Sequence, residues 1–591
     1  MRARHIMSLR ATLYVLVSLA VLALVACAAR STTQAPTRPV PTATPPEVAT
    51  AKPAAPTATS APPTSVASYA GKPLANFSTD DFQGSGRCAA CHASLKDAAG
   101  NDVTIDAQWR STMMANAARD PLFLASVSRE IERAPALRAI VEDKCSGCHM
   151  PMAHVQTLTT QGTPSMFESG FLSADNALHA AAMDGVSCAL CHQIADSNLG
   201  KQESFSGGYA IDASTSPPDR LVYGPFPSPE RETMRKSGGF TPVEGRQSTD
   251  AALCATCHTL YTPYVDAAGK VLGEFPEQTA YLEWQHSTYG GAGKAFPCQG
   301  CHMPAAAGPA LLSNLRTDPP LAARSPFAQH YFVGGNALML RLHSAHAAEL
   351  GLTCSTDHLN ASLDRVLAQV QERAASLSIA SAQASGSELS VVLELRSMAG
   401  HKLPTGFPSR RMWIHLVVTD SGGKIVFESG RCEADGSIAG DDGDSDEKAY
   451  EPHYDVITQP GQVQVYQSVM ANSDGQVTRA LLRAARYVKD NRLLPAGFDK
   501  ASAGKDFAVY GEGARDTNFV GGSDQVTFRI STGSAQGPFT ATAELLYQTL
   551  AYPFAKDLGA GSADEGERFA AYYATTDRTP VTVARIEQIV R

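Results

Sequence analysis

Apolar and polar residues alternate with a period of two along the C-terminal third of the chain. The alternation is clearest in the runs 389–395 and 539–545. Because a period of two places every second side chain on one face, each run predicts a strand with one buried face. Further β-type runs, separated by turn residues, cover 411–419, 424–428, 462–469 and 525–530. We therefore predict an antiparallel β-sandwich-like domain over 379–591, with a helix at about 563–575.

A helical period precedes this region. Apolar residues recur every three or four positions from Leu359 to Leu377, which predicts a helix with one apolar face. Either Ser355 or Thr356 is placed to cap the N-terminus of this helix. We interpret 336–378 as a helical connector that packs against its neighbours.

Residues 1–27 have the regions of an export signal in their usual order. Arginines at positions 2, 4 and 10 precede an apolar run over 11–26, and Cys27 follows it. The run is short for a membrane span and typical of a signal peptide. Its end resembles a bacterial lipoprotein signal, in which the cysteine is lipidated; an ordinary secretory signal is the alternative. We expect an extracytoplasmic protein, lipid-anchored at Cys27 on the periplasmic or cell-surface side of the membrane.

Residues 28–77 are rich in Pro, Thr, Ala and Ser and have almost no large apolar side chains. A segment of this composition cannot bury a core, so we predict a disordered tether. In an extended polyproline conformation it reaches on the order of 150 Å. An anchor and a tether of this kind hold a folded body near a surface and let it move.

Five C-x-x-C-H pentads follow. They are Cys88-Cys91-His92, Cys145-Cys148-His149, Cys188-Cys191-His192, Cys254-Cys257-His258 and Cys298-Cys301-His302. This spacing is the attachment signature of c-type haem. Two thiols on one helical turn can bond the two vinyl groups of a porphyrin, and the histidine then faces the iron as proximal ligand. Zinc sites usually pair two C-x-x-C units and do not repeat an adjacent Cys-His five times.

We therefore predict that residues 78–335 bind five haems c through these ten cysteines and five proximal histidines. Between the pentads, the sequence favours short helices and loops rich in Gly and Pro, such as 205–247. The predicted fold class is α+β multidomain. A mostly α or irregular multihaem domain is followed by the helical connector and the β-rich domain.

The sixth ligand of each iron decides between an electron carrier and an enzyme. A second protein ligand blocks substrate, whereas an open position can bind a small molecule. The candidate distal ligands are His154, His179, His330, His286 and Met113, with Met114 and His401 as further candidates. His343 and His346, on the predicted helix, and His415, in a strand, are at positions typical of packing or surface residues. The sequence does not assign a distal ligand to a particular haem.

Two further features carry possible chemistry. Asp442, Asp444 and Asp446 alternate in a Gly-containing loop, where carboxylates can turn toward one hard cation such as calcium. A solvated acidic loop is the alternative. Cys354 and Cys432 lie outside the pentads and are candidates for a disulfide.

Several motifs resemble the cytochrome c-554/c-prime-like multihaem cytochromes, whose relatives include hydroxylamine oxidoreductase and pentahaem nitrite reductase. They are CSGCHMP at 145–151, GVSCALCH at 185–192, CQGCHMP at 298–304, and the segments beginning at Trp109 and Trp284. The C-terminal half resembles the β-domain of extracytoplasmic multihaem proteins, through GHKLPTGFPSRRMW at 400–413 and YEPHYD at 450–455. The resemblance implies closely packed haem pairs, and it implies that His179 is a distal ligand.

The chain also departs from these relatives. It has no C-x-x-C-K site, which pentahaem nitrite reductase uses for its catalytic haem. It has fewer pentads than hydroxylamine oxidoreductase-like proteins have haems. Both departures count against a direct equivalence with either enzyme.

The leading hypothesis is electron transfer by a membrane-anchored cytochrome with redox protein partners in the cell envelope. The formal charge of −9 counts against a nucleic-acid partner. One alternative is a multihaem oxidoreductase that acts on a small nitrogen or sulfur compound at a five-coordinate haem. The other is a non-catalytic subunit of an oligomer, a respiratory complex or a cytochrome filament.

Overall fold

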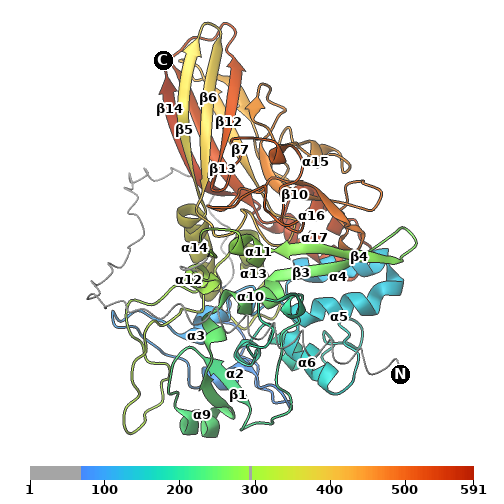
Figure 1. Ribbon diagram of the computed structural model, residues 1–591, viewed down its shortest axis with the longest axis vertical. Coiled ribbons are helices and arrows are strands. Elements are labelled where there is room, and N and C mark those ends of the chain that lie inside the picture. Colours follow the sequence, from blue (N-terminus) through green and yellow to red (C-terminus); the bar gives the residue numbers. More distant parts are fainter. Residues whose placement is uncertain (1–67, 292–295) are drawn as a thin grey trace, which may run out of the picture. The chain divides into compact units, whose positions relative to one another are not determined.

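The computed structural model describes residues 68–291 and 296–591, and residues 65–591 form one compact unit (Figure 1). The predicted α+β class is confirmed, because short helices dominate the first half and packed sheets the second. The predicted signal peptide, Cys27 and most of the predicted tether lie outside the described residues. Within the described ranges, the model has no helix whose length and apolarity would suit a membrane span.

The first half is built from short helices, as predicted. Asp120 caps α4 by accepting a hydrogen bond from the Leu122 backbone N–H, and Pro121 occupies the first helical position. The helices are α2 (Ser85–Ala89), α3 (Ile105–Trp109), α4 (Pro121–Arg133), α5 (Arg138–His149), α6 (Pro151–Thr159), α7 (His179–Met183), α8 (Cys188–Cys191), α9 (Arg231–Gly238), α10 (Ala251–His258), α11 (Ala280–Gln285) and α12 (Cys298–His302).

Two small sheets in this half were not predicted. Strands β1 (Leu221–Gly224) and β2 (Thr241–Glu244) pair in parallel within the expected loop 205–247. Strands β3 (Thr259–Val265) and β4 (Val271–Thr279) form an antiparallel hairpin directly after the fourth pentad. The hairpin was missed because Pro263 and Pro276 interrupt both of its strands, and proline is depleted in strands.

The predicted connector consists of two helices rather than one. These are α13 (Ala337–Ala345) and α14 (Thr356–Arg373). Gly351 lies between them with a φ of 62°, a left-handed conformation that favours glycine. Ser355 is the N-cap of α14, since its side chain accepts a hydrogen bond from the His358 backbone N–H. The helix ends earlier than predicted because β5 begins at Ala375.

The β-region contains two packed sheets. One has the strand order β11-β10-β7-β13-β14, with β8 paired to β7, and the other has the order β5-β6-β12-β9. Their bounds are β5 (Ala375–Ser385), β6 (Glu388–Ser397), β7 (Arg411–Thr419), β8 (Ile425–Ser429), β9 (Val456–Ile457), β10 (Val465–Ala471), β11 (Arg486–Asp490), β12 (Ser523–Ser531), β13 (Phe539–Gln548) and β14 (Val581–Val590). All pairs are antiparallel except β9 with β12.

One apolar core lies between the two sheets, as the period of two predicts. In one sheet Val391 lies opposite Phe528, and in the other Ile414 lies opposite Leu545. All four side chains are fully buried and belong to the same cluster. The helix expected near 563–575 is α17 (Asp564–Thr575), and α16 (Tyr552–Gly559) precedes it.

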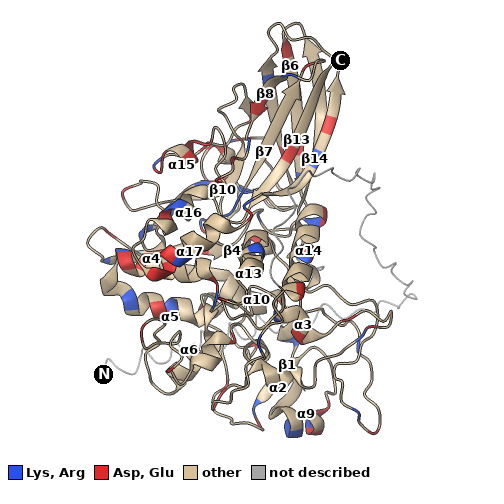
Figure 2. Ribbon diagram, turned by 180° about the vertical axis from the view of Figure 1, so that it is seen from behind, with Lys and Arg blue, Asp and Glu red and all other residues tan. Residues whose placement is uncertain are grey.

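Charged residues connect the two halves. Figure 2 shows residues of both charges on α4 and on α17, and Arg133 of α4 pairs with Asp557 of α16. The buried Glu130 carboxylate of α4 accepts the backbone N–H groups of Leu481 and Leu482 at 2.9 and 3.1 Å.

A buried arginine organises the acidic loop. One guanidinium nitrogen of Arg411 lies 2.9 Å from the Asp441 carboxylate. Asp444 accepts from two nitrogens of the same guanidinium, at 2.7 and 2.9 Å. All three side chains are at most 3% exposed. Because the pair is bidentate and excluded from water, removing the arginine leaves two buried charges without a partner.

Replacing Arg411 with Gln should lower the free energy of unfolding by about 3–5 kcal/mol. Urea unfolding followed by circular dichroism measures the change. Arg396→Gln is the matched control, because Arg396 pairs with Glu394 at 2.6 Å but is 64% exposed. The control should change stability by less than about 1 kcal/mol. Equal losses in both variants would contradict the role assigned to Arg411.

Candidate haem-binding sites

Each pentad occupies a helix or the turn that follows one. Helices α5, α10 and α12 end at the pentad histidine, and Asp250 caps α10 by accepting from the Ala252 backbone N–H. A helical turn brings residues three apart in sequence onto one face. The two cysteines of each pentad are therefore presented together, and all ten are free of disulfide bonds.

The fold brings thiols of different pentads side by side. Cys88 of the first pentad is a direct neighbour of Cys188 of the third. Cys148 of the second neighbours Cys257 of the fourth, and this thiol together with burial raises the pKa of Cys148.

The other close pairs of thiols from different pentads involve the fourth pentad. Cys254 neighbours Cys298 of the fifth pentad, and Cys191 of the third pentad lies close enough to Cys254 to raise its pKa further. All five pentads therefore form one connected series.

The third pentad is held by the segment around Trp109. The Trp109 indole N–H donates to the Val186 carbonyl at 3.0 Å, and the Val186 N–H donates to the Met114 carbonyl at 3.0 Å. Gly185 has a φ of 62°, and a Cβ there would lie 2.6 Å from the Ala115 carbonyl oxygen. This close approach explains why glycine precedes VSCALCH and why the two motifs occur together.

Burial lowers the pKa of four of the five proximal histidines, and a hydrogen bond to a backbone carbonyl orients three of the rings. Burial lowers the pKa of His149 and of His258 to about 4. A neutral imidazole is the form that binds a metal. In three pentads Nδ1 is hydrogen-bonded to a backbone carbonyl, namely His92 to Leu312 at 2.5 Å, His192 to Tyr223 at 2.7 Å and His302 to Val333 at 2.5 Å. Such bonds fix the ring and leave Nε2 free.

Three histidines outside the pentads have the same arrangement. Nδ1 is hydrogen-bonded to a backbone carbonyl in His179, His330 and His401, at 2.9, 3.2 and 2.9 Å. Burial, followed by the proximity of His192, lowers the pKa of His330 to about 3. Because their second ring nitrogen is free, all three rings have the geometry expected of a distal ligand.

The ring of His401 lies near that of the proximal histidine of the fifth pentad. The ring centroids of His302 and His401 lie 6.2 Å apart, and the ring planes differ by 17°. Two imidazoles on opposite sides of one metal ion, with metal–nitrogen bonds of about 2 Å, have centroids separated by about 6 Å. His401 lies in the β-region, far from the pentads in the sequence. Its position in the chain therefore made it only a further candidate distal ligand.

Other predicted distal ligands lie in different surroundings. His154 on α6 has its Nε2 bound to Asp143 at 2.8 Å. His286 is exposed and lies against Phe507, with ring centroids 4.6 Å apart. Met113 packs against apolar core side chains. These three do not share the arrangement of His179, His330 and His401, and their ligand role stays a prediction.

His343 is a residue that sequence patterns missed. It lies on α13, is fully buried, and neither of its ring nitrogens has a hydrogen-bond partner. Burial lowers its pKa to about 4, so the ring is neutral. An unpaired buried polar group costs free energy, which makes this histidine a further candidate ligand. A single histidine in an apolar helix forms no sequence motif that would mark it as a metal ligand.

The acidic loop does not bring three carboxylates together. Both oxygens of Asp444 are bound by Arg411, Asp442 is exposed, and Asp446 accepts from the Lys448 backbone N–H. Within the described ranges, the one group of three such side chains close enough to hold an ion is a different one. The calcium prediction has no support in this geometry. The predicted disulfide is absent, since Cys354 and Cys432 are both free.

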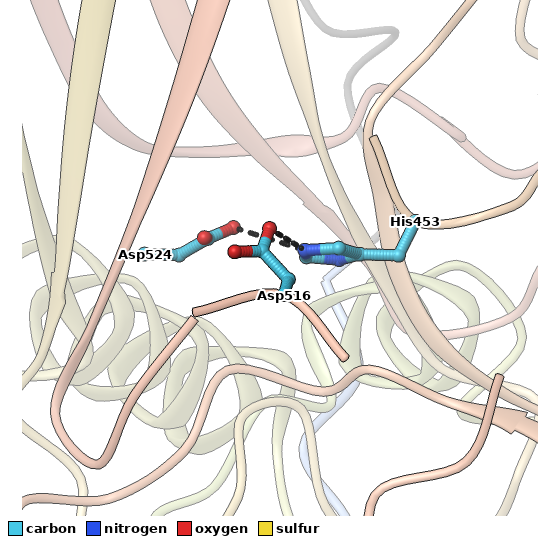
Figure 3. Close-up of side chains that lie close together, drawn as sticks. All are labelled: His453, Asp516 and Asp524. Carbon is cyan, nitrogen blue, oxygen red and sulfur yellow. Dashed lines mark hydrogen bonds and ion pairs between the residues drawn. The ribbon is translucent and has the colours of Figure 1, made fainter. Parts of the chain in front are cut away.

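That group consists of His453, Asp516 and Asp524 in the β-region (Figure 3). His453 Nε2 lies 3.1 Å from Asp516 and 3.9 Å from Asp524. His453 Nδ1 receives amide N–H groups from Gln464 and Asn491, at 2.9 and 3.0 Å.

The orientation of both amides is fixed by the backbone. The Gln464 oxygen accepts from the Tyr454 N–H and the Asn491 oxygen from the Gln467 N–H. Nδ1 of His453 is therefore an acceptor, and Nε2 carries the proton that Asp516 accepts. Because a protonated nitrogen has no lone pair for a metal, this group fits a buried hydrogen-bond network better than an ion site.

We expect the protein to bind no zinc at His453. After incubation with Zn²⁺ and gel filtration, elemental analysis should find equal background zinc in the wild type and in His453→Gln. One equivalent of zinc in the wild type that the variant loses would contradict the tautomer assignment.

Chelator treatment should leave the urea midpoint of unfolding unchanged, since the acidic loop is neutralised by Arg411 rather than by calcium.

Comparison with known proteins gives one similar solved structure, a penta-heme cytochrome c552 from Thermochromatium tepidum. The sequence identity is 16% and the TM-score 0.45, and the match covers 85% of this chain and 97% of that chain. No protein-family model that was searched matches the chain, and no curated protein matches it.

The residues of the pentads fit c-type haem. Each has two free thiols and a histidine, and the pentad histidines whose pKa is shifted, His149, His192, His258 and His302, are all held neutral by burial. His149 Nδ1 and both nitrogens of His343 are buried without a partner. A buried imidazole nitrogen without a partner at His149, in a pentad with two free thiols, fits a chain that binds haem c.

Proposed function

We propose that the chain is a pentahaem c-type cytochrome that transfers electrons. The observation that carries the proposal is the connected series of pentad thiols. A porphyrin is attached at its edge through the pentad sulfurs, so neighbouring sulfurs of different pentads bring porphyrin edges together. When bound, the haems supply one-electron redox chemistry. The chain's own contribution is to hold the neutral imidazoles, set the spacing and exclude water.

Two groups of imidazoles support a carrier rather than an enzyme. His302 and His401 would hold the fifth-pentad iron, and His330, which lies near both His192 and His92, would suit the third-pentad or the first-pentad iron. An iron with two protein ligands has no open position for a substrate. His179 and His343 are further donors for the remaining irons.

One observation favours the alternative, a multihaem oxidoreductase for a small nitrogen or sulfur compound. Burial lowers the pKa of His258 most, and His302 lowers it next. The Arg410 guanidinium then lowers the same pKa further. A guanidinium beside the fourth-pentad haem would suit a small anion. This candidate requires that the fourth haem lacks a second protein ligand.

We further propose that the protein works at the cell envelope. The support is in the sequence, where an export signal, Cys27 and a tether of low hydrophobicity precede the folded unit. A lipid anchor at Cys27 would let the unit meet redox protein partners near the membrane. Assembly into a respiratory complex or a filament is the remaining alternative. The specific kinship with cytochrome c-554/c-prime-like proteins also belongs to this proposal.

The exported protein should carry five covalently bound haems. Mass spectrometry of the purified chain should give the processed polypeptide plus five haem masses. The double change Cys298→Ala and Cys301→Ala should reduce the number to four, because it removes both attachment thiols of one pentad. Cys354→Ala is the control and should keep five. A wild-type mass equal to the bare polypeptide would end the redox proposal.

Replacing His401 with Ala should convert one haem of the five from low-spin to high-spin. The reason is that one iron loses its sixth ligand while the others keep theirs. Electron paramagnetic resonance of the oxidised protein measures the change, starting from a wild type with low-spin signals alone. His415→Ala is the control, since His415 lies on the β-region between Glu428 and Glu544. A high-spin haem in the wild type that binds cyanide or nitrite would favour the enzyme.

A further inference from the structure

Four buried charged side chains lie between α11 and the β-region. We call Glu283, Lys402, Asp490 and Arg492 the charge cluster. The Lys402 ammonium lies 2.7 Å from Asp490, and the Arg492 guanidinium lies 2.8 Å from Asp490 and 2.9 Å from Glu283. Their side chains are between 0 and 7% exposed. Two positive and two negative charges are balanced within the cluster.

A cluster of this kind is not explained by stability alone. Taking charges out of water costs several kcal/mol per ion, and well-packed apolar residues are often as stabilising as a buried ion pair. Such groups are retained in some proteins because they fix one arrangement of the chain. The question is which arrangement this cluster fixes.

Glu283 holds the loop that carries His401. One carboxylate oxygen of Glu283 accepts the Lys402 backbone N–H at 3.1 Å and the Thr405 hydroxyl at 2.8 Å. The other oxygen accepts the Thr279 hydroxyl at 3.0 Å, which ties Glu283 to the end of β4. The loop 401–405 is therefore bound at two points to a residue of the haem-binding half.

The same loop orients the His401 ring. The Lys402 carbonyl is hydrogen-bonded to His401 Nδ1 at 2.9 Å, while the Lys402 N–H is held by Glu283. The Lys402 ammonium is held by Asp490 and by the Ala508 carbonyl, at 2.7 and 2.9 Å. Because the backbone, the side chain and the carbonyl of Lys402 are all fixed, the ring of His401 has one orientation, facing His302.

We propose that the charge cluster is a positioning device, centred on Glu283, that presents Nε2 of His401 to the iron of the fifth-pentad haem. This inference rests on the proposed function, because it needs a haem at Cys298, Cys301 and His302. Glu283 touches neither the metal nor the porphyrin in this role. It acts through the backbone of Lys402.

Glu283→Gln is the decisive variant. The amide has the shape of the carboxylate, but it removes one negative charge from the cluster and places an N–H₂ group where one oxygen accepted hydrogen bonds. The fifth-pentad haem should become partly high-spin, and added imidazole should return it to low-spin. Electron paramagnetic resonance of the full holoprotein measures both. A purely structural role would lower the urea midpoint and leave the spin state unchanged, which would overturn the proposal.

The matched control is Glu451→Gln. Like Glu283, Glu451 is a fully buried glutamate, but it lies in the described β-region. Burial raises the pKa of Glu451 to about 7. It is bound to the Asp442 N–H, away from the loop 401–405. This variant should keep all haems low-spin. High-spin signal in this control equal to that of Glu283→Gln would mean that any buried glutamate has the same effect, and would overturn the proposal.

Two further variants distinguish failure of the ligand assignment from failure of the positioning role alone. If His401→Ala leaves every haem low-spin, the ligand assignment fails, and with it this part of the proposed function. If His401→Ala gives a high-spin haem but Glu283→Gln does not, only the positioning role fails. Should Glu283→Gln not fold, Thr405→Val decides, because it removes one contact to Glu283 with little change of volume. Thr405→Val should give a smaller high-spin fraction than Glu283→Gln, and added imidazole should reverse it. If Thr405→Val gave no high-spin fraction, the proposal would be overturned.

Discussion

The close approach of the five pentads is the constraint on which the rest of the structure depends. Ten thiols and five imidazoles converge in the first half of the chain, where the described helices are short and the apolar clusters are divided. Short helices are marginal by themselves and gain stability from what they pack against. In the proposed holoprotein that partner is porphyrin, so attachment and folding of this half are parts of one process.

The β-region meets this half with polar groups rather than with an apolar surface alone. Its own core is large and continuous between two sheets, and residues of the haem-binding half such as Val333, Met113 and Leu282 belong to it or pack against it. Polar contacts between the halves include the Glu130 carboxylate on two backbone N–H groups and the Glu283 carboxylate on the loop 401–405. Buried carboxylates of this kind impose a geometry, because each lone pair requires a donor at a defined place.

This arrangement gives the β-region a defined role in the proposed cytochrome. In the proposed cytochrome, the 6.2 Å separation of the His401 and His302 ring centroids would make the β-region part of the fifth haem site. The hydrogen-bond partners of His453 and Arg411, by contrast, lie within the β-region and serve its internal order.

The sequence by itself determined the features that depend on neighbouring residues. A period of two placed Val391 and Phe528 on buried faces, one of the two predicted caps, Ser355, is the N-cap of its helix, and the C-x-x-C-H spacing predicts the attachment residues, because each pattern acts within a few residues. Only the tertiary structure decided which pentads are neighbours, that Asp444 pairs with Arg411 instead of a cation, and that His401 rather than His154 faces a proximal histidine. These outcomes depend on segments far apart in the chain, and the energy of a buried charge or an unpaired imidazole is set by what the fold places beside it.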